Sequence, residues 1–132
     1  MANVVQASAK KQFMDGDIDL LADTIKVYLI DTADYTYSAS HGFLSDIPGV
    51  ARVANATLAS KTTTGGVFDA ADASFASVSG DVSEALAIVK DTGTEGTSPF
   101  IAYIDTGVGG LPVTPSGTNI TVTWSASGII AL

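Results

Sequence analysis

The sequence predicts an all-β protein, an antiparallel β-sandwich of about seven to nine short strands with little helix. Short apolar runs recur along the chain and are separated by turns rich in Gly, Ser, Thr and Asp. Aspartate outnumbers glutamate twelve to two, which fits strands and turns because Asp favours turns and caps whereas Glu favours helices. The two most apolar runs, Ala85–Val89 and Phe100–Ile104, do not alternate. We therefore expect them to be buried on both faces and to form the antiparallel centre of a sheet.

The chain before this centre is predicted to form several further short strands. Ile25–Ile30 reads IKVYLI and Ala51–Ala59 alternates between apolar and small or polar residues, so both are predicted strands. Between them, Tyr35–Tyr37 is either a short strand or an extended loop, and His41–Pro48 is one helical turn that ends at Pro48. Two short strands are predicted over 67–69 and 74–78, with turns on either side.

The chain after the centre is predicted to contain a long connection and two strands. Residues 106–119 hold four glycines and two prolines, which indicates an irregular connection and not a helix. The stretch Asn119–Ser125 alternates, so its apolar residues Ile120, Val122 and Trp124 are expected on one face. A last short strand is predicted over Ile129–Leu132.

The length of 132 residues indicates one domain. We assign residues 13–132 to a single β-sandwich and residues 1–12 to an N-terminal arm or a short helix, because the first residues carry only a weak apolar pattern.

The N-terminal arm differs from the rest of the chain in charge. It has no acidic residue and holds two of the six basic residues, Lys10 and Lys11. One hypothesis is that the arm adds a strand to the sheet of a neighbouring subunit, with Val4 and Val5 as side-chain anchors. The alternative is a frayed end or a helical turn that packs on its own subunit. The four residues Val4, Val5, Lys10 and Lys11 are therefore the predicted interface residues.

The overall charge of −8 argues against a nucleic-acid partner, because neutralising phosphates requires clustered Lys and Arg. The sequence has no cysteine and no apolar stretch long enough for a signal peptide or a membrane span. We expect a soluble protein that is made in a cytoplasm and has no membrane partner.

An aspartic-protease motif is the most tempting chemical signal. Asp105-Thr106-Gly107 follows an apolar strand, as the catalytic Asp-Thr-Gly of those proteases does, and Asp91-Thr92-Gly93 repeats it. Asp-Thr also occurs at Asp23 and Asp31, and three of the four copies directly follow a strand-like run. Because an Asp side chain accepts hydrogen bonds from the backbone two residues on, these copies are better explained as turns that end strands.

No other stretch supports catalysis or a metal site. Asp15, Asp17 and Asp19 have the opening spacing of a calcium loop, but Leu20 and Lys26 stand where an EF-hand needs Gly and Glu, so a solvated acidic turn is the simpler interpretation. His41 is the only histidine and is predicted to be a capping or loop residue. We predict no catalytic residue, no cofactor and no metal ligand.

The chain resembles a family of small virion structural proteins of tailed bacteriophages. Four stretches carry the resemblance: FMDGDIDLLADTIKVYLIDT, HGFLSDIPGVARV, GDVSEALAIVKDTGTEGTSPFIAYIDT and GLPVTPSGTNITVTW. It extends from Phe13 to Trp124 and is most specific over Glu84–Thr106. Members of this family usually lie beside capsid genes and are described as head decoration, cement or hypothetical structural proteins.

The resemblance implies a capsid decoration or cement protein, not an enzyme. Its implied partners are the major capsid protein and other copies of itself, with a trimer as the arrangement suggested by analogy. The implied location is the surface of the phage head. Another virion component of the neck, tail or head fibre is the alternative, and a ligand-binding or aspartic-protease-like sandwich is a further one.

Overall fold

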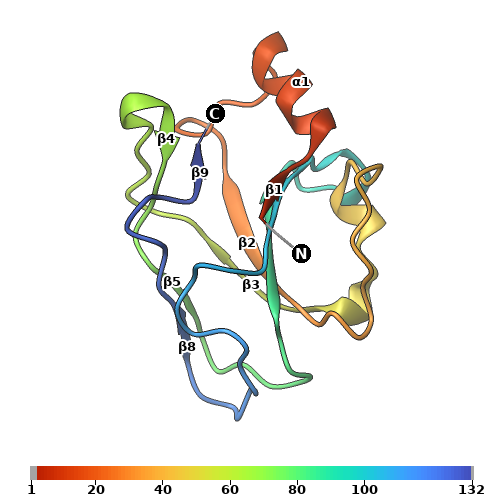
Figure 1. Ribbon diagram of the computed structural model, residues 1–132. Helices are drawn as coiled ribbons and strands as arrows, with labels where there is room; N and C mark the ends of the chain where they lie inside the picture. Colours follow the sequence, from red (N-terminus) through yellow and green to blue (C-terminus); the bar gives the residue numbers. More distant parts are fainter. Residues whose placement is uncertain (1–2, 132) are drawn as a thin grey trace.

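The computed structural model describes residues 3–131, and within them the chain forms nine strands, one α-helix and four short 3-10 helices. The strands are β1 (Val4–Val5), β2 (Ile25–Ile30), β3 (Arg52–Thr57), β4 (Val67–Phe68), β5 (Ala73–Phe75), β6 (Ala85–Lys90), β7 (Phe100–Ile104), β8 (Ile120–Val122) and β9 (Ile130–Ala131). The helices are α1 (Ala7–Asp15), η1 (Leu44–Asp46), η2 (Gly49–Ala51), η3 (Thr64–Gly66) and η4 (Glu95–Thr97). The fold is all-β and sandwich-like, as the sequence predicts (Figure 1).

The main sheet has five antiparallel strands in the order β1-β7-β6-β2-β3. Its centre is β6, which pairs with β7 on one side and β2 on the other; Leu86 lies opposite Ile104 and also opposite Leu29. All five residues of β7 and the first five of β6 are buried. The prediction that the two most apolar runs form the antiparallel centre of a sheet is therefore confirmed.

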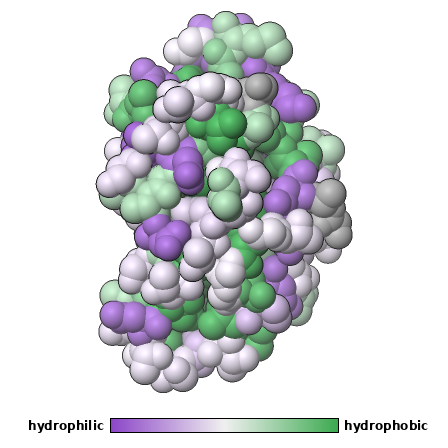
Figure 2. All heavy atoms as spheres, turned by 60° about the vertical axis from the view of Figure 1, so that its left-hand side comes forward, coloured by the Kyte–Doolittle hydropathy of each residue, from purple (hydrophilic) through white to green (hydrophobic). Residues whose placement is uncertain are grey.

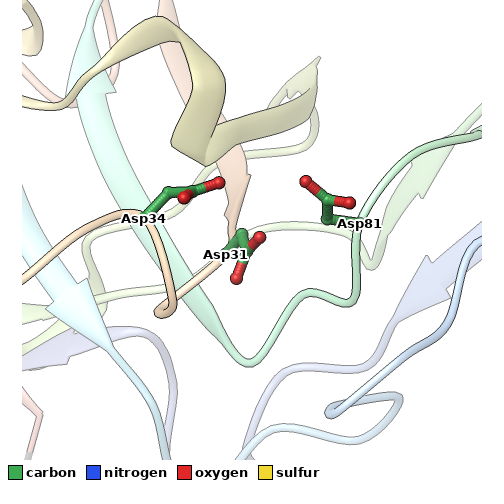
Figure 3. Close-up of side chains that lie close together, drawn as sticks. All are labelled: Asp31, Asp34 and Asp81. Atoms are coloured by element: carbon green, nitrogen blue, oxygen red, sulfur yellow. The ribbon is translucent and has the colours of Figure 1, made fainter.

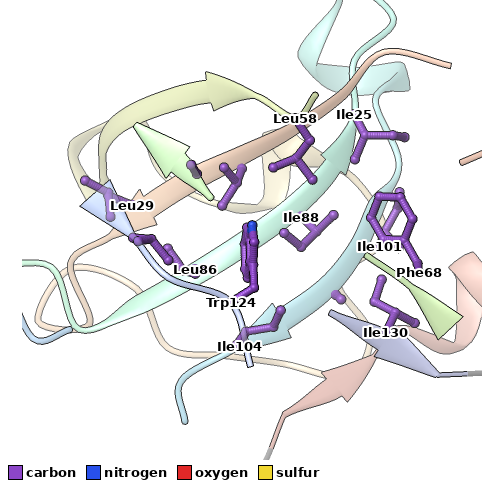
Figure 4. Close-up of a cluster of buried hydrophobic side chains, with 14 of the residues drawn as sticks. Ile25, Leu29, Leu58, Phe68, Leu86, Ile88, Ile101, Ile104, Trp124 and Ile130 are labelled. Carbon is purple, nitrogen blue, oxygen red and sulfur yellow. The ribbon is translucent and has the colours of Figure 1, made fainter. Parts of the chain in front are cut away.

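One face of the main sheet packs against two small sheets, β4–β9 and β5–β8, which lie to its left in Figure 1. Figure 4 shows this core: Ile25, Ile88 and Ile101 of the main sheet project toward Phe68, Trp124 and Ile130 of the covering segments. Trp124 also donates its indole N–H to the carbonyl of Ala71. As predicted, the alternation in the stretch around β8 directs Ile120, Val122 and Trp124 inward.

The opposite face of the main sheet is covered by the segment 31–51, which carries η1 and η2 and lies to the right in Figure 1. Its buried residues Tyr35, Leu44 and Ile47 pack on side chains of β6 and β7, including Phe100 and Tyr103. The predicted helical turn before Pro48 is present as η1, whereas Tyr35–Tyr37 forms a loop and not a strand. Because both faces are covered, the central strands contain no alternating polar residues.

The N-terminal segment forms the edge strand β1 of its own main sheet. Val4 lies opposite Tyr103 and Val5 opposite Ala102, and the backbone N–H of Gln6 donates to the carbonyl of Ile101 at 2.8 Å. This corrects the hypothesis that Val4 and Val5 pair with a neighbouring subunit, because the strand partner is β7 of the same chain. Of the two alternatives, the one in which the segment packs on its own subunit agrees with the structure.

The predicted division between an arm and a sandwich does not coincide with a break in the structure. The helix α1 runs through residue 12 to Asp15, where Gly16 ends it with a left-handed backbone of φ 80°. Residues Met1, Ala2 and Leu132, on which parts of the predicted arm and of the predicted last strand fall, lie outside the described residues.

Gln6 fixes the transition from β1 to α1. Its side chain is 1% exposed, its amide nitrogen donates to the carbonyls of Ser38 and His41, and its amide oxygen accepts from the Tyr37 hydroxyl. A buried amide with every polar atom satisfied holds the N-terminal segment against the segment that covers the sheet.

We predict that Gln6→Ala destabilises the fold by about 1–3 kcal/mol, because it leaves buried partners of this amide without a hydrogen bond. Urea unfolding followed by tryptophan fluorescence measures the change. Gln12→Ala is the matched control, since its side chain makes no hydrogen bond to any residue in 3–131. Equal stability of the two variants would contradict the anchoring role of Gln6.

We also predict that Ile88→Ala, in the middle of β6, costs about 2–5 kcal/mol, the range for truncating a fully buried side chain. Val50→Ala, at a site that is 73% exposed, is expected to change the free energy of unfolding by no more than about 0.5 kcal/mol. The same urea titration compares them. A small effect of Ile88→Ala would mean that β6 is not the centre of the core.

Candidate functional site

An apolar groove lies at the N-terminal edge of the main sheet. Its volume is about 530 Å³, and β1, α1 and the end of β9 form its walls. The lining residues are Asn3, Val4, Val5, Lys10, Phe13, Met14 and Ala131. Three of the four predicted interface residues, Val4, Val5 and Lys10, are therefore brought together at one site, whereas Lys11 is not among the lining residues.

The groove residues that the sequence analysis did not single out are Phe13, Met14 and Ala131. Met14 is 84% exposed at the end of α1, which is unusual for a large apolar side chain. The adjacent apolar pair Phe13-Met14, directly before the acidic run that starts at Asp15, is a signal that could have pointed to it. Ala131 gives no such signal, because its place beside β1 depends on the tertiary fold.

The groove has a basic side chain in an acidic protein. Across residues 3–131, Lys10 is the one cation of six that makes neither an ion pair nor a side-chain hydrogen bond. Lys11, one residue on, is paired with Asp15.

The surface around the two small sheets is mixed, with apolar residues gathered in patches among polar ones (Figure 2).

A cluster of three aspartates lies elsewhere in the molecule. Asp31 and Asp34 follow β2, Asp81 precedes β6, and their carboxylate oxygens lie within 4.8 Å of one another (Figure 3). Loss of solvation, followed by the charges of Asp31 and Asp81, raises the pKa of Asp34 above its ordinary value. Three carboxylates alone do not define a cation site, since such groups are common without one, and we assign no metal there.

The acidic residues that the calcium-loop spacing singled out are not brought together. In the part of the chain that the structure describes, Asp15, Asp17 and Asp19 form no cluster with metal-ligand spacing. Asp15 pairs with Lys11, and Asp19 instead accepts hydrogen bonds from the backbone N–H groups of Leu21 and Ala22. The sequence missed the Asp31–Asp34–Asp81 cluster because Asp81 approaches only through the pairing of β2 with β6.

Two of the four Asp-Thr copies, at Asp31 and Asp91, are the turn residues that the sequence predicts. Asp31 and Asp91 each accept, at 2.9 Å, a hydrogen bond from the backbone N–H two residues on, at Ala33 and Gly93. The bond from Gly93 and the nearby Lys26 ammonium lower the pKa of Asp91. The backbone after β7 is held differently, because the N–H groups of Asp105 and Thr106 donate to the side-chain oxygen of Asn3.

The two Asp-Thr-Gly copies do not form a protease dyad within one chain. Asp91 follows β6 and Asp105 follows β7, and these strands are antiparallel, so the two residues lie at opposite ends of the sheet. At about 3.4 Å per residue the five residues of β7 alone separate them by roughly 17 Å, whereas a dyad shares one proton over about 3 Å.

The single histidine belongs to a partly buried aromatic cluster. His41 Nδ1 lies 2.7 Å from the Tyr35 hydroxyl, and the rings of Tyr35 and Tyr37 lie 6.0 and 5.1 Å from that of Tyr103. Burial raises the pKa of Tyr35 and of Tyr103 to about 12, so both hydroxyls stay protonated at neutral pH. The cluster therefore packs the covering segment onto β7, which agrees with the predicted loop role of His41.

Comparison with known proteins does not assign the chain to a family. A scan against protein-family models found no match, and a search of curated proteins found no significant relative. No helix within residues 3–131 has the length and apolar character needed to cross a membrane.

We predict that Asp34→Asn raises the melting temperature at pH 7. A raised pKa means that the folded state binds the proton more tightly than the unfolded chain, so ionised Asp34 opposes folding above that pKa. The opposition disappears as the pH falls, and the gain from Asp34→Asn should therefore vanish near pH 3. Melting curves at both pH values measure it.

Asp17→Asn serves as the control for Asp34→Asn, because it removes the same charge outside the cluster. If both substitutions raise the melting temperature equally at pH 7, relief of the overall negative charge explains the gain and the local repulsion among the three aspartates does not.

Proposed function

We propose that the protein is a virion structural protein of a tailed bacteriophage, and specifically a decoration or cement protein that binds the head shell. The observation that carries the binding role is the groove of about 530 Å³, which joins exposed apolar side chains to Lys10 at an open sheet edge. Lys10 has no ion-pair partner among residues 3–131. The resemblance from Phe13 to Trp124 supplies the viral context.

The proposal is for binding and not for catalysis. Asp91 is engaged by Lys26 and by the backbone of its own turn, and His41 contacts a tyrosine that stays protonated. Within residues 3–131, neither Asp91 nor His41 has a second catalytic group in a geometry that would activate it for acid–base or nucleophilic chemistry. A groove with a few polar groups at its rim is instead typical of a recognition surface.

The sandwich suits a cement role physically. A protein that binds only the assembled shell stabilises that state by mass action, and the many equivalent sites on a shell repeat the effect. The partner in this proposal is the major capsid protein. Copies of the protein would meet around the local symmetry axes of the shell, where a trimer is the natural closed arrangement. Synthesis in the host cytoplasm precedes its assembly on the head surface.

We predict that the purified protein binds saturably to head shells that lack it and raises the temperature at which those shells break. The expected gain is about 2.7 kcal/mol per site when the free concentration is 100 times the Kd. Co-sedimentation measures binding, and light scattering during heating measures breakage.

A density map of the intact particle separates the proposed location from its alternatives. Density for the sandwich on the outer head surface supports the decoration role, whereas density in the neck, tail or head fibre assigns the protein to that component. Absence from the particle, or peptide cleavage by the purified protein that is lost in Asp105→Asn, would overturn a structural function.

A further inference from the structure

The edge strand β1 presents an unpaired backbone to the groove. In an antiparallel pair, successive residues point their N–H and C=O groups alternately toward and away from the partner strand. Gln6 donates to Ile101 of β7, so Val4 and Gln6 face β7 and Val5 faces the open side. Within residues 3–131, no group accepts from the N–H of Val5 or donates to its C=O.

A second free edge lies across the gap from β1. The strand β9 pairs with β4 and with no other strand of the described chain, and it belongs to a different sheet from β1. A hollow of about 160 Å³, lined by both strands, separates them and continues the groove. An extended segment beside β1 would therefore find backbone hydrogen-bonding groups on Val5 and apolar side chains around it.

The side chains of the groove define what such a segment must carry. Val5, Phe13 and the exposed Met14 offer contact to apolar side chains, which an extended segment presents at every second position. Lys10 offers a cation that no group in residues 3–131 neutralises. Asn3–Met14 contains no acidic residue, so this segment supplies no complementary charge of its own, and a partner that carries a carboxylate would match Lys10.

We infer that the groove is the acceptor site for an extended apolar segment of another protein that carries a carboxylate. The segment adds a strand to the outer side of β1, with main-chain hydrogen bonds to Val5, apolar anchors against Phe13 and Met14, and the carboxylate on Lys10. This inference rests on the proposed binding function and names the partner chemistry at its site. Another copy of the chain is the less favoured occupant, since two molecules of charge −8 repel each other at long range.

The test uses the full-length protein, immobilised, to select from a displayed library of random heptapeptides. We expect the selected peptides to have apolar residues at every second position and one Asp or Glu. Lys10→Glu should weaken the binding of the selected peptides by about tenfold or more. A new selection on this variant should favour peptides with Lys or Arg. Lys11→Glu is the matched control, because it makes the same charge change on the neighbouring residue outside the groove.

A second variant tests the backbone contact. Val5→Pro removes the N–H that faces the groove while leaving the bonds between β1 and β7 in place, since proline is tolerated where the N–H of an edge strand faces outward. Unchanged far-ultraviolet circular dichroism shows that the variant is folded. Peptide binding should fall about tenfold or more relative to the wild type.

The outcomes are distinguishable from those of the proposed function. Selection of no peptide, or of peptides whose affinity is the same for wild type, Lys10→Glu and Val5→Pro, overturns the acceptor site, even if the protein binds shells. Peptide binding with the expected pattern but no binding to shells upholds the site and overturns the cement role. Self-association that Lys10→Glu abolishes assigns the groove to a second copy and also overturns the inference.

Discussion

The burial of the β6–β7 pair on both faces is the constraint on which the rest of the structure depends. A sheet with two apolar faces must be covered twice, and this chain does so with small sheets on one side and an irregular segment on the other. The loop 31–51 therefore acts as a second covering layer. Two of its backbone carbonyls, those of Ser38 and His41, accept hydrogen bonds from the side-chain amide of Gln6.

The sequence predicts the parts of the fold that are set by uninterrupted local pattern. ALAIV and FIAYI are continuous apolar runs and IKVYLI is interrupted only by Lys26, because neither face of these strands is open to water, and that pattern is visible without knowing the partner strands. The pairing of Val4-Val5 with β7 could not be predicted in the same way. A two-residue strand has no period to detect, and Val4 is far in sequence from its partner Tyr103.

The candidate site was also predicted only in part from the sequence. The charge asymmetry of the first residues and the anchors Val4 and Val5 were visible in the sequence, and the structure places three of the predicted interface residues in one groove. Their roles differ from the predicted ones. The segment is not an arm that leaves its subunit, because β7 offers a free edge much closer and Gln6 holds the segment there. The sequence could not show this, because it does not reveal which side of β7 is left without a partner strand.

Because β1 covers the edge of β7, the free edge of the main sheet lies at β1. The sheet therefore still has an open edge on this side. β1 has two half-buried residues whereas all five residues of β7 are buried, so β1 is expected to open more easily than β7. A partner that hydrogen-bonds to Val5 would close the edge that β1 leaves open and would resist the opening of β1 and α1. Binding and local stability are then coupled through the same backbone groups, because a ligand at the groove stabilises the state in which β1 is paired with β7.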